Sequence, residues 1–516
     1  MYREQEYMAA REILGLRCDS SGEYTLPDYN GDVRKILAVK AKALPAGSFV
    51  GEDTLDISGS IRYEVVYIDA QNSITHAEFV TDYDAAVKVN SETYVDSDVR
   101  TTVAGCNMRL IGPRKMSVKC ALESDIRISE RRSEVIDGET FVEGNPEVKT
   151  VRARVNALSC LKGEAKELSE VMESLDGAIL DEVEILLSDA TVRCDSFDYT
   201  EGVLEINGSV LLCLLYKNGE DEPRLITREI PYSERILGEV GLEAFELFPR
   251  VDLTALKCTV EPNDTGVTIS LNLSLLPSAI AKANSTLTLC EDAYLKERGC
   301  YNEYSDFSYT EHLGSEESEF AFECRVPTSE LDVDGDFSVI YADAHCRIDS
   351  CDVDKNEVQI SGTVRFNAIA SQMSDDGTLS YYPLKIEDKF KKNVNINCQI
   401  SDITSCNCTS DIYDVKVEND GNNVVAKCCI LLSASLESHE HKRCISASYL
   451  TDEEYVRDES VVVAYYPDDS ETLFDIAKRF HTSVGAIAAR NRLTEEAFAS
   501  SSATASDLCC KRLIIG

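Results

Sequence analysis

Three stretches of this sequence repeat one pattern of alternating apolar and polar residues around a central glycine. They are EDTLDISGSIRYEVVYID from Glu52, EGVLEINGSVLLCLLYKN from Glu201 and KNEVQISGTVRFNAIASQ from Lys355, centred on Gly59, Gly208 and Gly362. Apolar residues at every second position predict a half-buried β-strand. Each run is longer than the usual strand of about five or six residues. We therefore expect the glycine, on the apolar face, to allow a bend or to admit another element.

Other landmarks recur in the same order around each glycine strand. An apolar segment lies upstream; downstream come a segment with an aromatic residue beside acidic residues, a turn, and a final alternating strand. The upstream segments are Ile36–Leu44, Val183–Val192 and Phe337–Cys346, the downstream segments begin at Ala77, Thr227 and Tyr381, and the turns are Gly112-Pro113, Asn263–Gly266 and Asn419–Asn422. The glycines are 149 and 154 residues apart, a period that is too long for a solenoid and predicts three copies of one domain.

Alternating strands separated by turn residues favour β-sandwich-like domains over a parallel α/β sheet. We therefore predict a mainly β protein with three repeated β-sandwich-like domains followed by a small α+β domain. The predicted boundaries are 1–145 for the first repeat with its N-terminal preamble, 146–290 and 291–448 for the next two repeats, 449–459 for a linker, and 460–516 for the last domain. The stretch YREQEYMAAREILGLR, from Tyr2, is predicted to be a helix.

The final segment has a different pattern. Val461–Tyr466 reads as a strand, and Ser470–Phe480 has apolar residues at helical spacing, with Ser470 as the expected N-cap. Ser483–Asn491 predicts a second short helix capped by Ser483, and Lys511–Gly516 predicts a closing strand. The order is β-α-α-β.

This segment resembles a LysM domain. The matching residues are Thr472, Leu473, Ile476, Ala477, Ser483, Val484, Ile487, Asn491 and Leu493. The family's usual Gly-Asp is Ser470-Glu471 here, and its frequent tryptophan is Phe474. The resemblance implies binding of N-acetylglucosamine polymers such as peptidoglycan, in a groove between the strand-to-helix and helix-to-strand loops. Use of the same small domain for protein contacts is the other interpretation.

The three repeats with an I-x-G-x-V strand, followed by a LysM-like segment, resemble SPOCS domains and the architecture of SipL-like and SpoVID-like spore coat morphogenetic proteins. The resemblance implies a non-enzymatic scaffold in endospore coat assembly. Its expected partner is the basement-layer ATPase of the coat, of the stage IV sporulation protein A type, bound through the LysM-like module. The candidate binding residues are Asp469, Ser470, Glu471, Thr472 and an exposed aromatic, Phe474, with Arg490, Asn491 and Arg492 on the facing turn.

Charge and cysteine usage restrict the possible partners and compartment. The 92 acidic and 51 basic residues give a formal net charge of −41, which disfavours binding to nucleic acid or to an anionic membrane. Apolar stretches are strand-sized, and the first residues do not read as a secretion signal. We expect a cytoplasmic protein, at the forespore surface of the mother cell if the coat resemblance holds. The 20 cysteines include no C-x-x-C pair and are expected to be reduced structural thiols, with oxidative cross-linking as the alternative.

No catalytic residues, cofactor or metal ligands are nominated, and we do not expect an enzyme. The sequence contains no H-E-x-x-H, Walker loop or G-x-G-x-x-G. His439 and His441 could contact a metal ion if they lay on a strand, with Cys444 nearby. Because they fall in the polar stretch SHEHKRC, we expect a solvated linker there.

Overall fold

The computed structural model describes residues 4–28, 30–135, 145–219, 221–331, 333, 336–354, 357–374, 377–396, 403–456, 461–468, 470–493 and 512–515. The protein is mainly β, with its two α-helices near the C-terminus, so the predicted fold class is confirmed. None of the helices in these ranges is long and apolar enough to cross a membrane.

Each repeat contains two packed antiparallel sheets. In the first repeat, β1 (Glu4–Thr25), β7 (Lys115–Val135) and β6 (Tyr94–Gly112) form one sheet in the order β1-β7-β6. The other sheet contains β2 (Val33–Ala43), β3 (Gly47–Val50), β4 (Thr54–Asp69) and β5 (Ile74–Lys88), with the glycine strand β4 in the middle. Apolar residues from both sheets form the core between them.

The second and third repeats follow the same plan. The second has β13-β14-β8 with β9 on one face, and β10-β11-β12 on the other; the third has β15-β20-β19 and β16-β17-β18. The strands of the second repeat are β8 (Glu147–Lys162), β9 (Lys166–Asp176), β10 (Val183–Thr200), β11 (Val203–Asn218), β12 (Arg224–Leu237), β13 (Glu246–Pro262) and β14 (Gly266–Tyr294). Those of the third are β15 (Arg298–Pro327), β16 (Ser338–Asp354), β17 (Glu357–Met373), β18 (Leu379–Asn395), β19 (Ser405–Asn419) and β20 (Asn423–Glu454). The expected boundaries at 290/291 and 448/449 fall inside β14 and β20.

Each central glycine lies directly opposite an aromatic residue of the next strand. Gly59 pairs with Tyr83, Gly208 with Tyr232 and Gly362 with Phe390. A Cβ atom on Gly208 would lie 2.6 Å from the Tyr232 hydroxyl oxygen and would also overlap the carbonyl oxygen of Arg193. The glycine therefore admits the aromatic ring, which explains why an aromatic residue recurs in the segment after each glycine strand.

Equivalent positions of the three glycine-strand sheets meet at one centre. Val66, Leu215 and Ile369, spaced like the glycines, belong to one apolar cluster. Beside it, Lys40 and the equivalent residues Asp189 and Asp343 form a charged group: Lys40 Nζ lies 2.5 Å from Asp189 Oδ2 and 3.7 Å from Asp343 Oδ1. Lys42 Nζ also lies 3.4 Å from Asp189 Oδ1. The three domains thus pack around a common centre, where Lys40 lies between two carboxylates.

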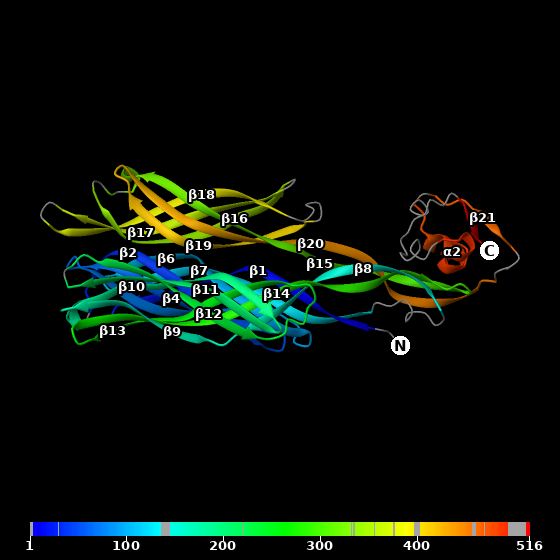
Figure 1. Cartoon of the computed structure of the whole chain (residues 1–516), viewed down its shortest axis with the longest axis horizontal. Coiled ribbons are helices and arrows are strands. Elements are labelled where there is room, and N and C mark those ends of the chain that lie inside the picture. Colours follow the sequence, from blue (N-terminus) through cyan, green and yellow to red (C-terminus); the bar gives the residue numbers. More distant parts are fainter. Residues whose placement is uncertain are drawn as a thin grey trace.

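The longest strands continue beyond the sandwiches as an arm that reaches the C-terminal module (Figure 1). The arm consists of residues 147–155 of β8, 285–294 of β14, 298–310 of β15 and 439–454 of β20. It packs through an apolar cluster that includes Val155, Leu287 and Phe307, together with Tyr7 and Ala9 of β1. Because both ladders are antiparallel and continuous into the body, the arm extends from the sandwiches without an intervening loop.

The helix predicted near the N-terminus is wrong. Residues Glu4–Thr25 form β1 and pair along nearly their whole length with β7. Tyr7 and Ala9 of β1 are buried in the arm cluster. Pairing with a distant strand overrides the local helical pattern, because the tendency of a segment to form a strand depends on the side chains it packs against in the sheet.

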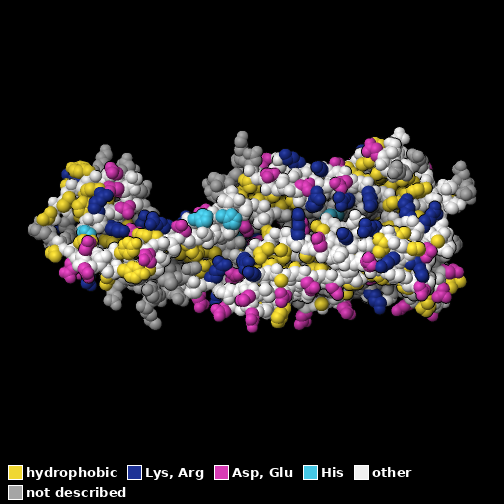
Figure 2. Space-filling model, turned by 180° about the vertical axis from the view of Figure 1, so that it is seen from behind, with side chains coloured by type: hydrophobic (Ala, Val, Ile, Leu, Met, Phe, Trp, Pro, Cys, Tyr) yellow, Lys and Arg dark blue, Asp and Glu magenta, His cyan; other side chains and the backbone are white. Residues whose placement is uncertain are grey.

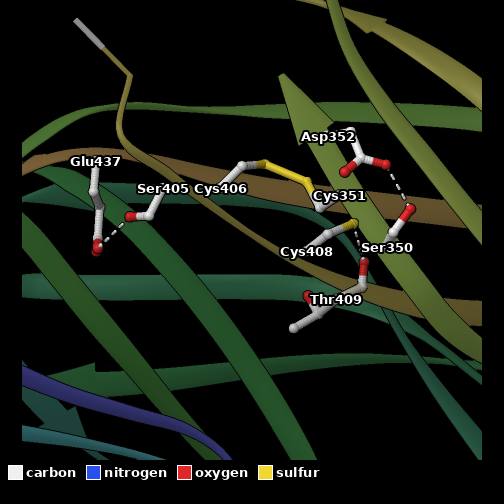
Figure 3. The surroundings of a disulfide bond; sticks show 8 residues. All are labelled: Ser350, Cys351, Asp352, Ser405, Cys406, Cys408, Thr409 and Glu437. Atoms are coloured by element: carbon white, nitrogen blue, oxygen red, sulfur yellow. Dashed lines mark hydrogen bonds between the residues drawn. A yellow bond between two sulfur atoms is a disulfide. The ribbon is translucent and has the colours of Figure 1, made fainter. Parts of the chain in front are cut away.

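The expectation of reduced thiols throughout is wrong for one pair. Cys351 of β16 and Cys406 of β19 form a disulfide, with Cα atoms 6.1 Å apart (Figure 3). The two strands belong to different sheets of the third sandwich, so the bond joins those sheets covalently. Cys408, two residues further along β19, hydrogen-bonds to the Thr409 carbonyl oxygen, and burial raises the pKa of its thiol to about 12.

Candidate functional site

The C-terminal module is built on two capped helices and a short sheet. β21 (Val463–Tyr465) pairs with β22 (Leu513–Ile515), and α1 (Leu473–Arg479) and α2 (Val484–Asn491) lie between them in sequence. Thr472, not Ser470, is the N-cap of α1: its hydroxyl accepts a hydrogen bond from Asp475 N at 3.2 Å, and the Asp475 carboxylate accepts one from Thr472 N. This capping box satisfies two backbone donors at once. Ser483 caps α2, as predicted, by accepting from Ala486 N at 3.1 Å.

Phe474 is not the exposed aromatic expected from the sequence. Its side chain is 1% exposed and lies in the core of the module, where it packs edge-on against Tyr294 with ring centroids 5.2 Å apart. Tyr294 is the last residue of β14, at the tip of the arm. The arm therefore contributes a residue to the module's own hydrophobic core, which makes Phe474 unavailable to a partner.

Polar contacts also join the module to the arm. The Tyr294 hydroxyl donates to the Thr482 carbonyl oxygen at 2.6 Å, and Lys478 Nζ lies 2.5 Å from Asp292 Oδ2. Tyr455, just after β20, stacks on the His481 ring with centroids 3.7 Å apart. These contacts come from Lys478, near the C-terminal end of α1, and from His481 and Thr482, which follow the helix, and they fix one face of the module against the arm.

Glu471 makes its contacts within the module. Its carboxylate accepts hydrogen bonds from the Tyr465 hydroxyl, at 2.7 Å to Oε2, and from Asp468 N, and forms an ion pair with Arg479 at 2.7 Å. The hydrogen bond from Tyr465, followed by that of the Asp468 backbone and by Arg479, lowers the pKa of Glu471. This carboxylate orders the loop between β21 and α1.

Asn491 also has a structural position. Its amide nitrogen donates to the carbonyl oxygens of Ile487 and Ile514 at 2.9 and 2.8 Å, and its oxygen accepts from Ile514 N at 2.7 Å. The side chain thus ties the end of α2 to β22. The remaining candidates are surface residues: Ser470, Arg490 and Arg492 are exposed, and Asp469 lies outside the described residues.

An apolar strip on β21 was not among the residues nominated from the sequence. Val462, Ala464 and Tyr466 alternate along the strand and its two flanking residues, and all three are exposed, Val462 at 59% and Tyr466 at 68%. The intervening Val463 and Tyr465 pack against the module's core. We call Val462, Ala464 and Tyr466 the apolar rim. The alternation of VVVAYY contains this signal, because one of the two faces of a strand must point outward.

Comparison with known proteins identifies this module and does not reach the sandwiches. No curated protein and no solved structure matches the chain significantly. The model of the LysM domain family matches residues 469–497, which include α1 and α2. The C-terminal part of the chain therefore contains a LysM domain.

Proposed function

We propose that this chain is a non-enzymatic scaffold in endospore coat assembly, which docks to the basement-layer ATPase of the coat through the apolar rim of its LysM domain. The observation that carries the proposal is the exposed face of β21, where Val462, Ala464 and Tyr466 present apolar surface to solvent. Contiguous apolar surface with an aromatic residue suits a protein partner, because such residues dominate the buried centre of protein interfaces.

The inward-facing candidates support a protein partner over a sugar. Their polar atoms already make hydrogen bonds within the module: Thr472 caps α1, Glu471 bonds to Tyr465, and Asn491 bonds to β22. Polar groups that are already bonded within the protein are poor donors to a glycan hydroxyl, since one hydrogen bond would only replace another. In this proposal the sandwiches and the arm hold the LysM domain away from the body, in the mother-cell cytoplasm at the forespore surface.

A pull-down with the purified coat ATPase tests the proposal. Tyr466→Ala in the full chain should weaken capture by about tenfold or more, because truncation of an interface tyrosine removes much of the contact energy. Phe49→Ala is the matched control, since Phe49 is an aromatic residue of β3 with 71% exposure, in the first sandwich and far from the module. Equal capture of the wild type and Tyr466→Ala would contradict docking through the rim.

A second candidate is binding of peptidoglycan, which the LysM match itself supports. Co-sedimentation of the full chain with purified peptidoglycan checks this function separately. If it holds, the wild type sediments with the polymer, and Arg490→Ala, at an exposed position in the last turn of α2, reduces the sedimenting fraction without unfolding the chain. If the wild type stays in the supernatant, the glycan function is excluded.

A further inference from the structure

We propose that His439 and His441 form a surface site for a divalent transition-metal ion that prefers imidazole, such as Ni²⁺, Cu²⁺ or Zn²⁺. The sequence alone left these residues in an expected linker. They lie instead within β20, where their register partners are Thr310 and Ser308 of β15. Both histidines are exposed, and Figure 2 shows neighbouring histidine side chains on the surface near the start of the arm.

The strand geometry places both imidazoles on one face. Residues two apart on a strand point to the same side and are separated by roughly 6.6 Å along it, a distance that two imidazole side chains can bridge to one ion. His439 and His441 are such a pair, and β20 is regular between them. Cys444, which the sequence offered as a third ligand, is an odd number of residues away and pairs with Ser305 on the opposite face. The proposed site therefore has two protein ligands.

Each imidazole is held by a hydroxyl group through the ring nitrogen nearer the backbone. Ser308 Oγ lies 2.7 Å from His441 Nδ1, and Thr310 Oγ1 lies 3.1 Å from His439 Nδ1. When Nδ1–H donates to the hydroxyl oxygen, Nε2 keeps its lone pair, which is the tautomer that binds a metal ion. Two histidine–hydroxyl pairs from the same two strands thus hold both imidazole rings in place. Residues that hydrogen-bond to metal-ligating histidines orient those rings in the same way.

Charged residues of both signs lie near the pair. Glu437, two residues before His439 on β20, is close enough for the two groups to interact electrostatically. Asp306 and Arg443 are register partners on β15 and β20, two residues from Ser308 and His441. The Arg443 guanidinium lies over the Tyr304 ring, 4.2 Å from its centroid. The chain as a whole has a formal net charge of −41. Among the described residues no three potential ligands come together, so water or another molecule's ligand would complete the coordination.

Titration of the full chain with Ni²⁺, followed by calorimetry and by near-ultraviolet absorption, tests the site. Imidazole binding gives heat without the charge-transfer band that a nickel–thiolate bond produces, so cysteine binding is recognised separately. The wild type should bind one ion per chain without that band. His439→Ala or His441→Ala should abolish this event, and Ser308→Ala should weaken it about tenfold by removing the outer-shell hydroxyl.

Two controls keep the result interpretable. His76→Ala removes a histidine of β5 in the first sandwich and should leave the titration unchanged. Circular dichroism of each variant checks that β20 remains folded. Equal Ni²⁺ binding by the wild type and by the folded double variant His439→Ala/His441→Ala would overturn the proposal, as would binding that always carries the thiolate band.

Discussion

The Tyr294 hydroxyl, at the tip of the arm, donates a hydrogen bond of 2.6 Å to the Thr482 carbonyl oxygen inside the LysM domain. The two residues are 188 positions apart in the chain, and the Tyr294 ring is 4% exposed. A buried tyrosine contributes both apolar area and a hydrogen bond, so this one side chain anchors the module to the body.

Tyr294→Ala should therefore release the LysM domain from the arm. Loss of a buried aromatic side chain costs about 3–5 kcal/mol, and we expect it to appear as a separate, earlier unfolding transition of the module. Tyr294→Phe, which removes only the hydrogen bond, should cost about 1 kcal/mol. Differential scanning calorimetry of the three proteins measures both effects. A single unshifted transition in Tyr294→Ala would show that the anchor is elsewhere.

Gly208→Val should destabilise the second sandwich. The new side chain would collide with the carbonyl oxygen of Arg193 and the ring of Tyr232, both of which belong to neighbouring strands. Overpacking of this kind costs about 1–3 kcal/mol or more. The control is Gly105→Val in β6, where an added Cβ has no atom within 4 Å. Urea unfolding should show a loss for Gly208→Val well above that for Gly105→Val; equal losses would contradict the ring-over-glycine assignment.

Lys40→Met should be strongly destabilising because it removes the ion-pair partner of Asp343 and leaves Asp189 with Lys42 alone, 3.4 Å away. Burial lowers the pKa of Lys40, but the nearby carboxylates of Asp189 and Asp343 outweigh it and raise that pKa well above its usual range. Breaking a buried ion pair by removing one partner costs about 3–5 kcal/mol.

The triple variant Lys40→Met/Asp189→Asn/Asp343→Asn should regain part of this stability, since the two carboxylates that lost Lys40 are then neutral and only Lys42, with a side chain 36% exposed, loses its partner. Lys385→Met, at an exposed position of β18, is the control for loss of a lysine alone. Chemical unfolding of the four proteins decides the question: a triple variant less stable than Lys40→Met would mean that the carboxylates do not repel each other there.

Acid should loosen the contact between the first and second sandwiches. Glu184 of β10 accepts a hydrogen bond from the Thr75 hydroxyl of β5 and pairs with Lys217 Nζ at 3.0 Å. Burial acts to raise its pKa, but the interactions with His76, Thr75 and Lys217 prevail and lower it to about 2. A carboxyl group whose pKa is lowered in the folded protein stabilises the fold at pH values above its pKa in the unfolded chain, which is about 4.3. This contribution is lost as the pH falls toward 2.

Glu184→Gln should accordingly flatten the decline in the unfolding midpoint between about pH 5 and pH 2, while lowering the midpoint at pH 7. Thermal unfolding monitored across this range compares the variant with the wild type. If both proteins lose stability in parallel as pH falls, Glu184 does not carry the effect.

The repeated strands were predictable because their information is local. Alternation around Gly59, Gly208 and Gly362 fixes a strand and its buried face, and the turn residues mark its neighbours. The N-terminal strand was not predictable from its own residues, because its partner, β7, lies about a hundred positions later. The same holds for the disulfide between Cys351 and Cys406, since sequence spacing does not specify pairing.

Within the candidate site, the error at Phe474 has the same origin. Its local pattern fits a helix start with an exposed aromatic residue, whereas the structure buries it in the module's core, where Tyr294 of β14 packs edge-on against it. The N-cap at Thr472 could have been predicted in place of Ser470, because Thr472 and Asp475 have the spacing of a capping box. The sequence did not predict that His439 and His441 lie on a strand, because their neighbours are polar. These neighbours are polar because the arm is exposed to solvent, not because the segment is a linker.

Replacement of Tyr466 by the photo-reactive residue benzoylphenylalanine gives the sharpest check of docking through the LysM domain. The full chain carrying this residue, irradiated in a mixture of the purified coat ATPase and soluble peptidoglycan fragments, should form a covalent adduct with the ATPase. The same residue placed at Phe49 should form none. An adduct with glycan fragments alone, or equal cross-linking from both positions, would contradict the proposal that the apolar rim binds a protein partner.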